Sequence, residues 1–383
     1  MKITVVGVGY VGLSLAMILA RKHSVTCYDS NFEKLNSLGS LTLNEEKIHI
    51  LKAFSSKDAY REAEMIFVCV PTNLNKEQQS LDTSNLEDVL NNISAYCPQA
   101  NVIIKSTLSM ESISVLKSYE HQLAIFYAPE FLKENTALHD SLYPSRIVLG
   151  YLNKSDSMAA NEIATILKDC TEMPSVKTII TSIGNAIAIK LFSNAYLAMR
   201  LSFFNELDSF SQFYDLNTLE IIEGVSLDPR IGDTYNHPSF GFKGYCLPKD
   251  TISLTTSFSN VPSAVIPAII ESNQKRISYA IEKILEYIKN NQCKKIGIYR
   301  LTMEKNSKNV RFSIMEDVIE GLRSHGVEPL VYEPLLKENN DYNVQIISFQ
   351  QLLQCDVIIT NRFQEELNRV KEKVYTWDIE KNK

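Results

Sequence analysis

The chain has 383 residues, enough for two or three domains with a substantial buried core. Its composition is that of an ordinary soluble protein, and its formal net charge of −6 argues against a nucleic-acid partner, which would favour a basic surface. The seven cysteines include no C-x-x-C pair, so the sequence predicts neither a zinc site nor a redox dithiol, and we expect no metal. An odd number of cysteines without a pattern fits a reducing compartment, so we expect a cytoplasmic protein. Cys27 and Cys69 lie in apolar, strand-like runs and are expected in the core.

Residues 3–20 are almost wholly apolar and follow Lys2, as in a signal peptide or a membrane span. Three glycines at fixed spacing interrupt the run, no small-residue cleavage site follows, and the next segment has the pattern of a strand. We therefore expect neither a leader peptide nor a membrane protein.

The first 29 residues follow the order strand, glycine-rich turn, helix, strand and acid. Lys2–Val6 is a β-branched strand, residues 7–12 read Gly-Val-Gly-Tyr-Val-Gly, an apolar helix reaches about Arg21, and the strand Ser24–Tyr28 ends at Asp29. Such glycines allow a close approach of the backbone to a pyrophosphate at a helix N-terminus, and the acid bonds a ribose hydroxyl. An acid here disfavours a 2′-phosphate, so the sequence predicts NAD. The alternative is that the glycines serve only tight packing.

Polar residues follow three further strands, at 65–70, 102–105 and 123–127, and another strand is expected at 146–150. Ligands of an open parallel sheet bind at the carboxyl ends of its strands, so Thr72, Thr107 and Glu130 are candidates to line the crevice. Each alone could be a helix cap or a turn residue, but the recurrence at three strand ends favours function. Glu134 follows Glu130 by four residues, so the two carboxylates would share one face if the segment is helical.

Residues 182–214 have the pattern of a long apolar helix that carries Lys190 and Asn194 one turn apart. Polar groups on such a face are costly unless paired, which favours contact with a substrate over a surface lysine that extends to solvent. A capping box at Asn217 predicts a short helix that ends at Gly224. The aperiodic segment 225–247 offers Arg230 for a phosphate and Tyr235 for a ring, whereas His237 is expected to be a turn residue.

The decapeptide 241–250, Gly-Phe-Lys-Gly-Tyr-Cys-Leu-Pro-Lys-Asp, places a cysteine beside a helix start. Pro248 is expected to open a helix, so Cys246 lies just outside a positive helix end, with Lys249 close by. Both features favour the thiolate, which is the nucleophilic form, and Asp250 could handle a proton or a water. The alternative is a buried structural cysteine.

An amphipathic helix is expected at 261–290, with an apolar stripe wide enough to suggest a dimer contact. From Lys294 a second strand–helix–strand unit follows, with strands at 295–299, 329–332 and 354–360 and a helix at 314–324, but without the glycine turn. Arg300, Lys305, Lys308 and Arg311 follow its first strand, either as a phosphate clamp or as solvated charges.

Taken in order, these motifs resemble the bacterial UDP-glucose 6-dehydrogenase family of nucleotide-sugar dehydrogenases. The resemblance runs nearly end to end and rests on Gly7-x-Gly9-Tyr10-Val11-Gly12, Lys105-Ser106-Thr107, Pro129-Glu130-Phe131-Leu132, Lys190-Leu191-Phe192-x-Asn194 and Gly244-Tyr245-Cys246-Leu247-Pro248-Lys249-Asp250. It implies an α/β fold with an NAD-binding Rossmann-like domain at 1–181, a helical dimerisation domain at 182–290 and a UDP-binding Rossmann-like domain at 291–383.

The resemblance also implies a four-electron oxidation with two NAD molecules used in turn. Cys246 would form a thiohemiacetal and then a thioester, from which water releases UDP-glucuronate. Lys190 and Asn194 would hold the reacting oxygen, Asp250 and Thr107 would position water, and Glu130 would assist hydrolysis or handle the thiol proton.

The same resemblance implies two sets of binding residues. The NAD contacts would be Gly7, Gly9, Tyr10, Val11, Gly12, Asp29, Thr72, Thr107, Glu134, Lys249 and Arg311. The substrate contacts would be Glu130, Phe131, Leu132, Lys190, Asn194, Tyr196, Tyr235, Lys243 and Arg230, the last from a neighbouring subunit of a homodimer.

The sequence departs from the family at Lys243, where glycine is usual, and at Phe312, where a small residue is usual. Lys243 could crowd the sugar, bind a phosphate or point to solvent. Oxidation of another UDP-hexose, such as an N-acetylated one, therefore stays open, as does an alcohol dehydrogenase that stops at the aldehyde. A non-catalytic sensor is a further alternative, but Cys246, Lys190, Asn194 and Asp250 together argue against it.

Overall fold

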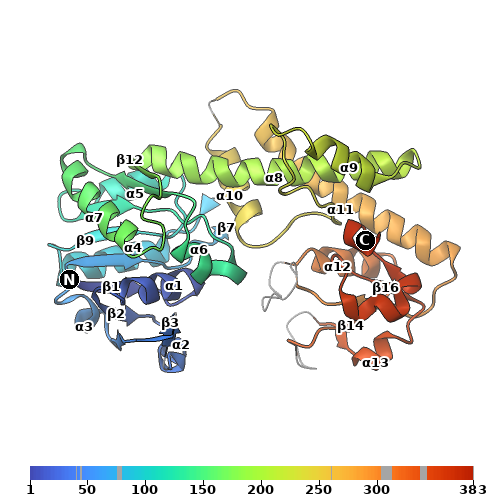
Figure 1. Ribbon diagram of the computed structural model, residues 1–383, viewed down its shortest axis with the longest axis horizontal. Coiled ribbons are helices and arrows are strands. Elements are labelled where there is room, and N and C mark those ends of the chain that lie inside the picture. Colours follow the sequence, from blue (N-terminus) through green and yellow to red (C-terminus); the bar gives the residue numbers. More distant parts are fainter. Residues whose placement is uncertain are drawn as a thin grey trace. The chain divides into compact units, whose positions relative to one another are not determined.

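The protein is described from a computed structural model, which describes residues 1–39, 41–43, 45–75, 80–259, 261–302, 313–336 and 343–382. The chain forms two compact units, Met1–Ser193 and Asn194–Lys383, and each is described by itself (Figure 1).

The first unit is built on an eight-stranded sheet with the order β12-β11-β10-β9-β6-β1-β2-β5. Neighbouring strands are parallel except for β10 and β11, which are antiparallel. The strands are β1 (Lys2–Val6), β2 (Ser24–Tyr28), β5 (Ile50–Lys52), β6 (Met65–Val68), β9 (Asn101–Ile104), β10 (Ala124–Tyr127), β11 (Ile147–Tyr151) and β12 (Thr178–Ser182). The predicted Rossmann-like α/β fold is therefore confirmed for this unit.

Helices and short hairpins complete the first unit. The hairpins are β3 (Leu41–Leu43) with β4 (Glu46–Ile48), and β7 (Leu74–Asn75) with β8 (Ser80–Leu81). The helices are α1 (Tyr10–Leu19), α2 (Phe32–Ser37), α3 (Ser56–Tyr60), α4 (Ser84–Tyr96), α5 (Ser112–Lys117), α6 (Ala137–Leu142) and α7 (Ser157–Asp169), with single 3-10 turns at Glu134–Thr136 and Lys154–Asp156. Apolar residues of α1, α6 and α7 pack on the sheet around Val5, Phe67, Ile103 and Phe126.

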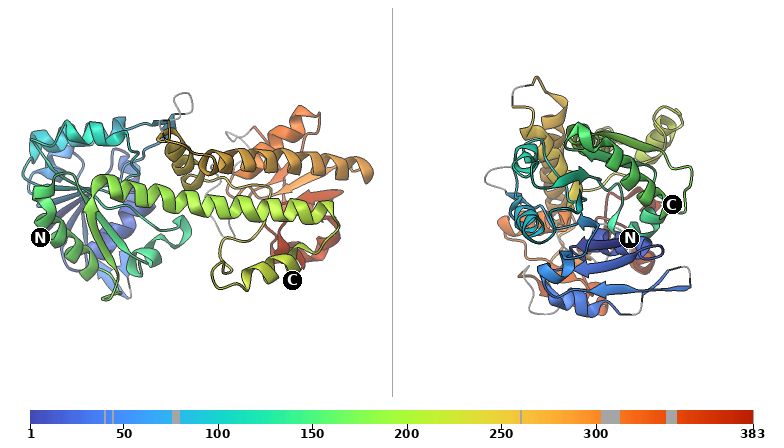
Figure 2. Two further views of the ribbon diagram at one scale, coloured as in Figure 1. Left: turned by 90° about the horizontal axis from the view of Figure 1, so that it is seen from above. Right: turned by 90° about the vertical axis from the view of Figure 1, so that its left-hand side faces the viewer.

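One unbroken helix, α8 (Ile183–Phe213), supplies the start of the second unit (Figures 1 and 2). In this unit α8 is followed by α9 (Thr218–Ser226), α10 (Cys246–Thr256) and α11 (Val265–Asn290). The second-unit part of α8 lies beside α11, since the Ser202 hydroxyl donates to the carbonyl oxygen of Ile269 at 3.3 Å (Figure 2).

A second, five-stranded sheet follows, and all its strands are parallel, in the order β15-β14-β13-β16-β17. Its elements are β13 (Ile296–Tyr299), α12 (Ile314–Ser324), β14 (Leu330–Tyr332), β15 (Gln345–Ile346), α13 (Phe349–Leu352), β16 (Val357–Ile359) and β17 (Val374–Tyr375), with 3-10 segments at Glu365–Lys373 and Ile379–Asn382. This order is again Rossmann-like, and its core includes residues of α11.

Most of the apolar stripe of α11 is covered by the chain itself, which removes most of our reason for expecting a dimer contact there, although Val265 at its start is exposed. Ile284 and Ile288 are buried in one core with Ile298 and Ile314, and Ile277 packs against it. Exposed aromatic side chains gather on α8 of this unit and just after it, at Tyr196, Phe203, Phe210, Phe213 and Tyr214. We call this set the α8 aromatic face.

A buried ion pair joins three segments of the second unit. The Arg276 guanidinium of α11 donates to the Asp208 carboxylate of α8 at 2.5 Å and to the carbonyl oxygen of Ser239 at 2.8 Å. It also lies 4.0 Å from the centre of the Trp377 ring. A guanidinium this deeply buried is tolerated only because its N–H groups are hydrogen-bonded and its charge is paired.

Several predicted boundaries are wrong. The helix expected from 261 begins at Val265, and the strand expected at 354–360 spans Val357–Ile359. Gly224 does not end its helix, because α9 continues to Ser226. The helix after the cysteine loop begins at Cys246, two residues before Pro248, because a proline is accommodated anywhere in the first turn, where amide donors lack helical partners. The three predicted domain boundaries, 1–181, 182–290 and 291–383, remain a prediction.

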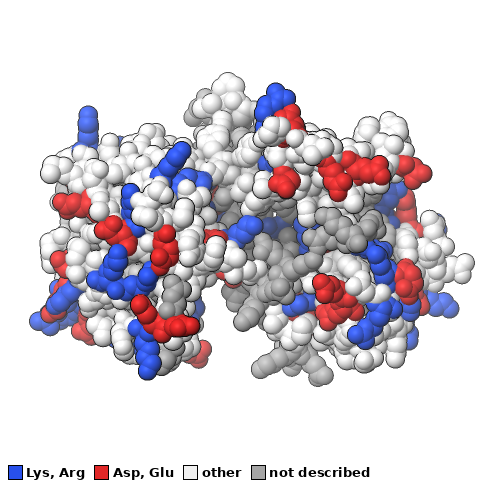
Figure 3. All heavy atoms as spheres, in the orientation of Figure 1, with Lys and Arg blue, Asp and Glu red and all other residues white. Residues whose placement is uncertain are grey.

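Acidic and basic side chains alternate over the visible face of the described residues (Figure 3). No helix in the part of the chain that the structure describes is long and apolar enough to cross a membrane.

Candidate active site

The glycine turn after β1 has the geometry of a dinucleotide cradle. Gly7 has φ +90°, and a Cβ there would lie 2.5 Å from the carbonyl oxygen of Cys69. A Cβ on Gly12 would lie 1.9 Å from the carbonyl oxygen of Gly7, so only glycine lets α1 start this close to the strand. At Gly9, by contrast, a Cβ would meet no described atom within 4 Å. The first and third glycines are thus required by the fold, and the second leaves backbone open toward a ligand. Tyr10 and Val11 open α1 at this turn.

Asp29 lies at the carboxyl end of β2, directly beside that turn. Its carboxylate accepts from the main-chain nitrogen of Val8 at 2.7 Å and from that of Asn31 at 2.9 Å. Asp29 is therefore placed where a ribose next to the turn would meet it. The glycines and the acid are thus compatible with the predicted dinucleotide contacts, which remain a prediction.

The second sheet repeats this arrangement without the glycines. Arg300, which follows β13, has φ +60°, and its nitrogen donates to the carbonyl oxygen of Tyr332 at 2.8 Å, as Gly7 does to Tyr28. Glu333, after β14, is buried and accepts from the nitrogen of Leu301 at 2.7 Å and from that of Leu335 at 3.1 Å. Glu333 thus braces the loop after β13 as Asp29 braces the loop after β1.

Thr72 and Thr107 are brought together at the carboxyl edge of the first sheet. The Thr72 hydroxyl donates to the carbonyl oxygen of Thr107 at 2.9 Å, and Ser106 donates to that of Val70 at 2.6 Å. These bonds join the segments that follow β6 and β9, as expected for residues that line one crevice.

Glu130, just after β10, is held by two lysines. Its carboxylate forms an ion pair with Lys105, and its main-chain oxygen accepts from the Lys190 ammonium of α8 at 2.7 Å. Lys105 was not among the predicted site residues, although it belongs to the Lys105-Ser106-Thr107 motif. It directly follows β9, and the rule that selected Thr107, a polar residue at the carboxyl end of a strand, would also have selected Lys105.

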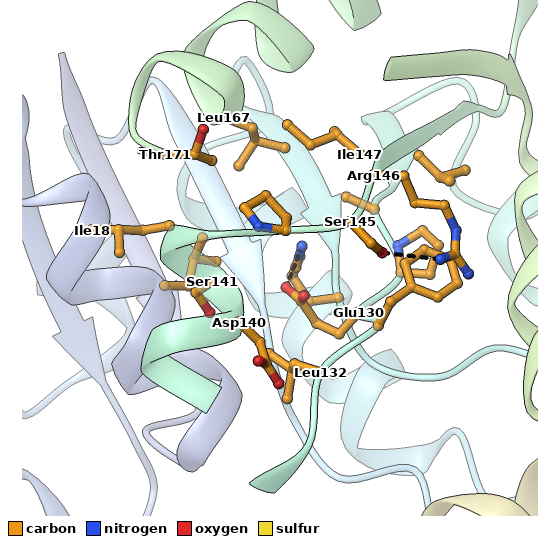
Figure 4. A pocket seen from close by; sticks show the side chains of 17 residues that line it. Ile18, Glu130, Leu132, Asp140, Ser141, Ser145, Arg146, Ile147, Leu167 and Thr171 are labelled. Carbon is orange, nitrogen blue, oxygen red and sulfur yellow. Dashed lines mark hydrogen bonds and ion pairs between the residues drawn. The ribbon is translucent and has the colours of Figure 1, made fainter. Parts of the chain in front are cut away.

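A cavity of about 60 Å³ lies in the first unit beside Glu130 (Figure 4). Leu132, Asp140, Ser145 and Arg146 also line it. The Arg146 guanidinium stacks 3.7 Å from the centre of the Phe131 ring and fixes it. Glu134 is exposed and starts a 3-10 turn, so Glu130 and Glu134 do not share a helical face.

In the second unit, α10 gathers the predicted nucleophile and its partners. Cys246 is the first residue of the helix and is partly exposed, and Asp250 follows one turn later with no exposed surface. The side-chain amide of Asn194 donates to the Asp250 carboxylate at 2.5 Å. Lys249 is buried and its ammonium lies 4.2 Å from the centre of the Tyr245 ring. Cys246 thus starts a helix, where the unpaired amides favour an anion.

The loop before Cys246 is fastened to α11 and α12. Asn273 bonds both the nitrogen and the carbonyl oxygen of Phe242 at 2.8 Å. The Lys243 ammonium lies 2.9 Å from Asp317 and 3.4 Å from Glu316, in the first turn of α12. Lys243 is absent from the described residues with positive φ, so its backbone tolerates a side chain. Its ammonium is held by carboxylates, an arrangement that none of our three alternatives included.

The remaining predicted substrate residues are dispersed in the second unit. Arg230 has a side chain that is 87% exposed, and it pairs with Asp228 at 2.7 Å, which lowers the pKa of that carboxyl. Tyr196 is exposed on α8, and Tyr235 is a loop residue with φ +54°. Arg311, Phe312, Lys305 and Lys308 lie outside the described residues.

The predicted core cysteines behave as structural thiols. Burial raises the pKa of Cys27 to about 12 and raises that of Cys69 as well. Cys27 has no exposed surface, while Cys69 retains some. Within the described residues, no group of three His, Cys, Asp or Glu side chains could hold a metal ion.

A parallel sheet with this glycine turn and a paired acid defines a dinucleotide-binding α/β protein, and the comparisons with known proteins identify its family. Residues 1–168 match the NAD-binding domain of the UDP-glucose/GDP-mannose dehydrogenase family, and residues 184–275 match the central domain of that family. The chain is 37% identical to UDP-glucose 6-dehydrogenase of Campylobacter jejuni and 36% identical to that of Streptococcus pneumoniae, each over 99% of both chains.

A solved UDP-glucose dehydrogenase from Pyrobaculum islandicum shares the fold, with a TM-score of 0.81 at 23% identity over 94% of this chain and 89% of that chain. The chain therefore belongs to the UDP-glucose/GDP-mannose dehydrogenase family. The predictions of an NAD-dependent dehydrogenase and of its fold class are confirmed.

Proposed function

We propose that this protein oxidises UDP-glucose to UDP-glucuronate in two successive NAD-dependent steps at Cys246. Full-length similarity to two bacterial UDP-glucose 6-dehydrogenases is the observation that carries the proposal. The clustering of Cys246, Asp250 and Asn194 around the start of α10 supports the covalent part of it.

The first unit supplies the cofactor site. NAD, when bound, accepts a hydride from the sugar carbon in each oxidation. The open backbone at Gly9 receives the pyrophosphate, and Asp29 binds the ribose. Tyr10, Val11, Thr72, Thr107, Glu134 and Lys249 are the further proposed contacts.

Cys246 is the proposed nucleophile. Its thiolate adds to the aldehyde carbon produced by the first oxidation, which gives a thiohemiacetal, and the second oxidation leaves a thioester. Water then breaks the carbon–sulfur bond, which releases the acid and restores the thiol. The start of α10 supports this role, because helix amides there stabilise a thiolate.

Lys190 and Asn194 are proposed to hold the reacting oxygen, and a positive lysine suits a developing oxyanion. Asp250 and Thr107 position the water, and Glu130 takes its proton. The bond between Asn194 and Asp250 supports a shared task, since it fixes both side chains. Phe131, Leu132, Tyr196 and Tyr235 complete the sugar-nucleotide contacts.

Lys243 is compatible with this substrate. Its ammonium is drawn to Glu316 and Asp317 of α12, so it is held by carboxylates of its own unit. We therefore expect it to leave the sugar space open, as the family's glycine would.

We further propose a cytoplasmic homodimer in which Arg230 reaches the substrate of the other subunit. The α8 aromatic face supports the dimer, because exposed apolar patches of this kind mark interfaces. The exposure of Arg230 leaves its guanidinium accessible to a second chain. Light scattering of the purified protein tests the dimer directly.

The decisive experiment measures NADH formed per sugar consumed, with UDP-glucose and with N-acetylated UDP-hexoses. Two NADH per UDP-glucose are expected, and one would indicate an enzyme that stops at the aldehyde. Turnover of another hexose without turnover of UDP-glucose would contradict the proposed substrate.

The matched variant is Cys246→Ala, with Cys293→Ala as a control for loss of a partly exposed thiol elsewhere in the same unit. We expect Cys246→Ala to abolish acid formation and to leave NAD affinity near that of the parent. Acid release by Cys246→Ala at a comparable rate would show that the mechanism is not covalent.

A further inference from the structure

Lys105 is fixed at the carboxyl edge of the first sheet by its own backbone. Its nitrogen donates to the carbonyl oxygen of Val68 at 2.8 Å, which continues the pairing of β9 with β6 beyond Ile104. The following Ser106 is tied to Val70 by its hydroxyl. The Lys105 side chain therefore starts from a rigid point beside Thr107.

The Lys105 ammonium is buried and paired. The side chain is 7% exposed, and its charge meets the Glu130 carboxylate, whose side chain is 23% exposed. A buried ammonium requires such a partner, because an unpaired charge removed from water destabilises the folded state strongly. The dashed line at Glu130 in Figure 4 marks this pair at the wall of the cavity.

Glu130 is consequently anchored at both ends by different elements. Lys190 of α8 holds its main-chain oxygen, and Lys105 after β9 holds its carboxylate. Only the second contact sets the direction of the carboxylate and the charge beside it.

We propose that Lys105 is the positioning residue for Glu130, which it orients toward the cavity and to which it supplies a neighbouring positive charge. The inference rests on the proposed role of Glu130 as the group that takes the proton of the hydrolytic water. Lys105 itself exchanges no proton in this scheme.

Several charged or polar groups surround the Glu130 carboxylate. Positive groups attract the carboxylate and negative groups repel it, so both kinds bear on where it lies. Besides Lys105, the groups on the packed elements are Cys69 after β6, Asp140 of α6, Arg146 at the start of β11 and Lys190 of α8. Of these cations, Lys105 is the one that the structure pairs with the carboxylate itself.

The test compares kcat and KM of Lys105→Met with those of the parent protein. Removal of the ammonium leaves the direction of the Glu130 carboxylate unset, so thioester hydrolysis should slow and the thioester should accumulate, seen as added mass on Cys246. At pH 7 we expect kcat to fall about tenfold, with KM for UDP-glucose and for NAD within about threefold of the parent values.

Lys105→Arg should restore most of the lost kcat, because it keeps the charge beside Glu130. Lys22→Met is the matched control, since it removes an exposed lysine of the same unit that donates to the Asp169 carbonyl oxygen. A kcat of Lys105→Met close to that of the parent, with no thioester accumulated, would overturn the inference. If that variant does not fold, Lys105→Gln is judged by the same two measurements.

Glu130→Gln separates this inference from the proposed function. We expect it to accumulate a thioester, seen as added mass on Cys246. Thioester hydrolysis at the parent rate in Glu130→Gln contradicts the role of Glu130. Slow hydrolysis in Glu130→Gln together with an unchanged kcat in Lys105→Met contradicts the role of Lys105 alone.

Discussion

The two parallel sheets of this protein begin alike and differ in the turn that follows the first strand. In both, a residue with positive φ leaves the strand, and its nitrogen bonds the end of the second strand, at Gly7 and at Arg300. In both, an acid after the second strand accepts two main-chain bonds, at Asp29 and at Glu333. Only the first sheet has glycines that bring a helix directly against the turn.

The glycines and the acid of the motif therefore do different things. The acid braces the loop in both sheets, so its presence alone does not indicate a dinucleotide site. The glycines are needed only where the helix must start within contact of the strand. The dinucleotide site therefore depends on the glycines together with the acid, and the second sheet shows what remains without them.

The largest effect is expected from Gly12→Ala. A Cβ at this position would lie 1.9 Å from a main-chain oxygen, which cannot move aside, so the free energy of unfolding should fall by about 3 kcal/mol or more. Urea unfolding followed by circular dichroism measures this loss.

Gly321→Ala in α12 is the matched change in the second sheet. Its Cβ would lie 2.4 Å from the end of the Ile281 side chain and 2.9 Å from both of its γ-carbons, so this β-branched side chain must shift, while alanine favours the helix by about 1 kcal/mol. A loss clearly smaller than that of Gly12→Ala is expected, because a side chain can move where a main-chain oxygen cannot. Equal losses of unfolding free energy in the two variants would show that the close approach of α1 to the glycine turn does not require glycine at position 12.

A smaller effect is expected from the two acids, compared as Asp29→Asn and Glu333→Gln. Each amide loses one of two accepted main-chain bonds, which should cost about 1–3 kcal/mol of stability. Asp29→Asn should in addition weaken NAD binding by about 1–3 kcal/mol, whereas Glu333→Gln should leave it unchanged. Calorimetric titration with NAD distinguishes them. Unaltered NAD affinity in Asp29→Asn would show that Asp29 only holds its loop in place, as Glu333 does, and does not contribute to NAD binding.

The smallest effect concerns the core thiols, Cys27 in the first sheet and Cys355 beside the second. Burial raises the pKa of both, that of Cys27 to about 12, so at pH 8 about one Cys27 thiol in ten thousand is ionised. Iodoacetamide should therefore modify neither in the folded protein, and should modify Cys246 first.

These thiols also report which sheet opens first. Because burial raises the folded pKa of both thiols above the unfolded value of about 8.5, their contribution to stability is complete below pH 8.5 and is lost as the pH rises, for Cys27 toward pH 12. Mass spectrometry in rising urea should show each thiol modified as its own unit unfolds. Modification of Cys27 in the folded protein at pH 8 would contradict its burial.

Periodicity predicted the main strands and long helices, because each is a buried run with a clear pattern. The segment 24–28 became β2 and the segment 182–214 became α8, nearly to the residue. The hairpin β3–β4 and the strand β5 were missed, since runs of three residues are too short to show alternation. The antiparallel pairing of β11 was also invisible, because pattern carries no strand direction.

Site residues were predictable where a motif fixes them and unpredictable where tertiary packing does. The glycines, Asp29, Cys246 and Asp250 follow from local spacing. Lys105 lies 25 residues from its partner Glu130, and Glu316 lies 73 residues from its partner Lys243. A local sequence pattern does not reveal pairs that are so far apart in the chain. The stripe on α11 was visible, but its cover by α12 and β13 was not.

The pairing of Lys243 with Glu316 and Asp317 has a consequence for the medium in which the protein works. That contact is partly open to solvent, so dissolved salt weakens it, whereas the two hydrogen bonds between Asn273 and Phe242 of the same loop are uncharged and respond little to salt. Ionic strength thereby acts on the loop that leads to Cys246. A chain with glycine at position 243 would lack this ion pair, so salt would not weaken the attachment of the loop in this way.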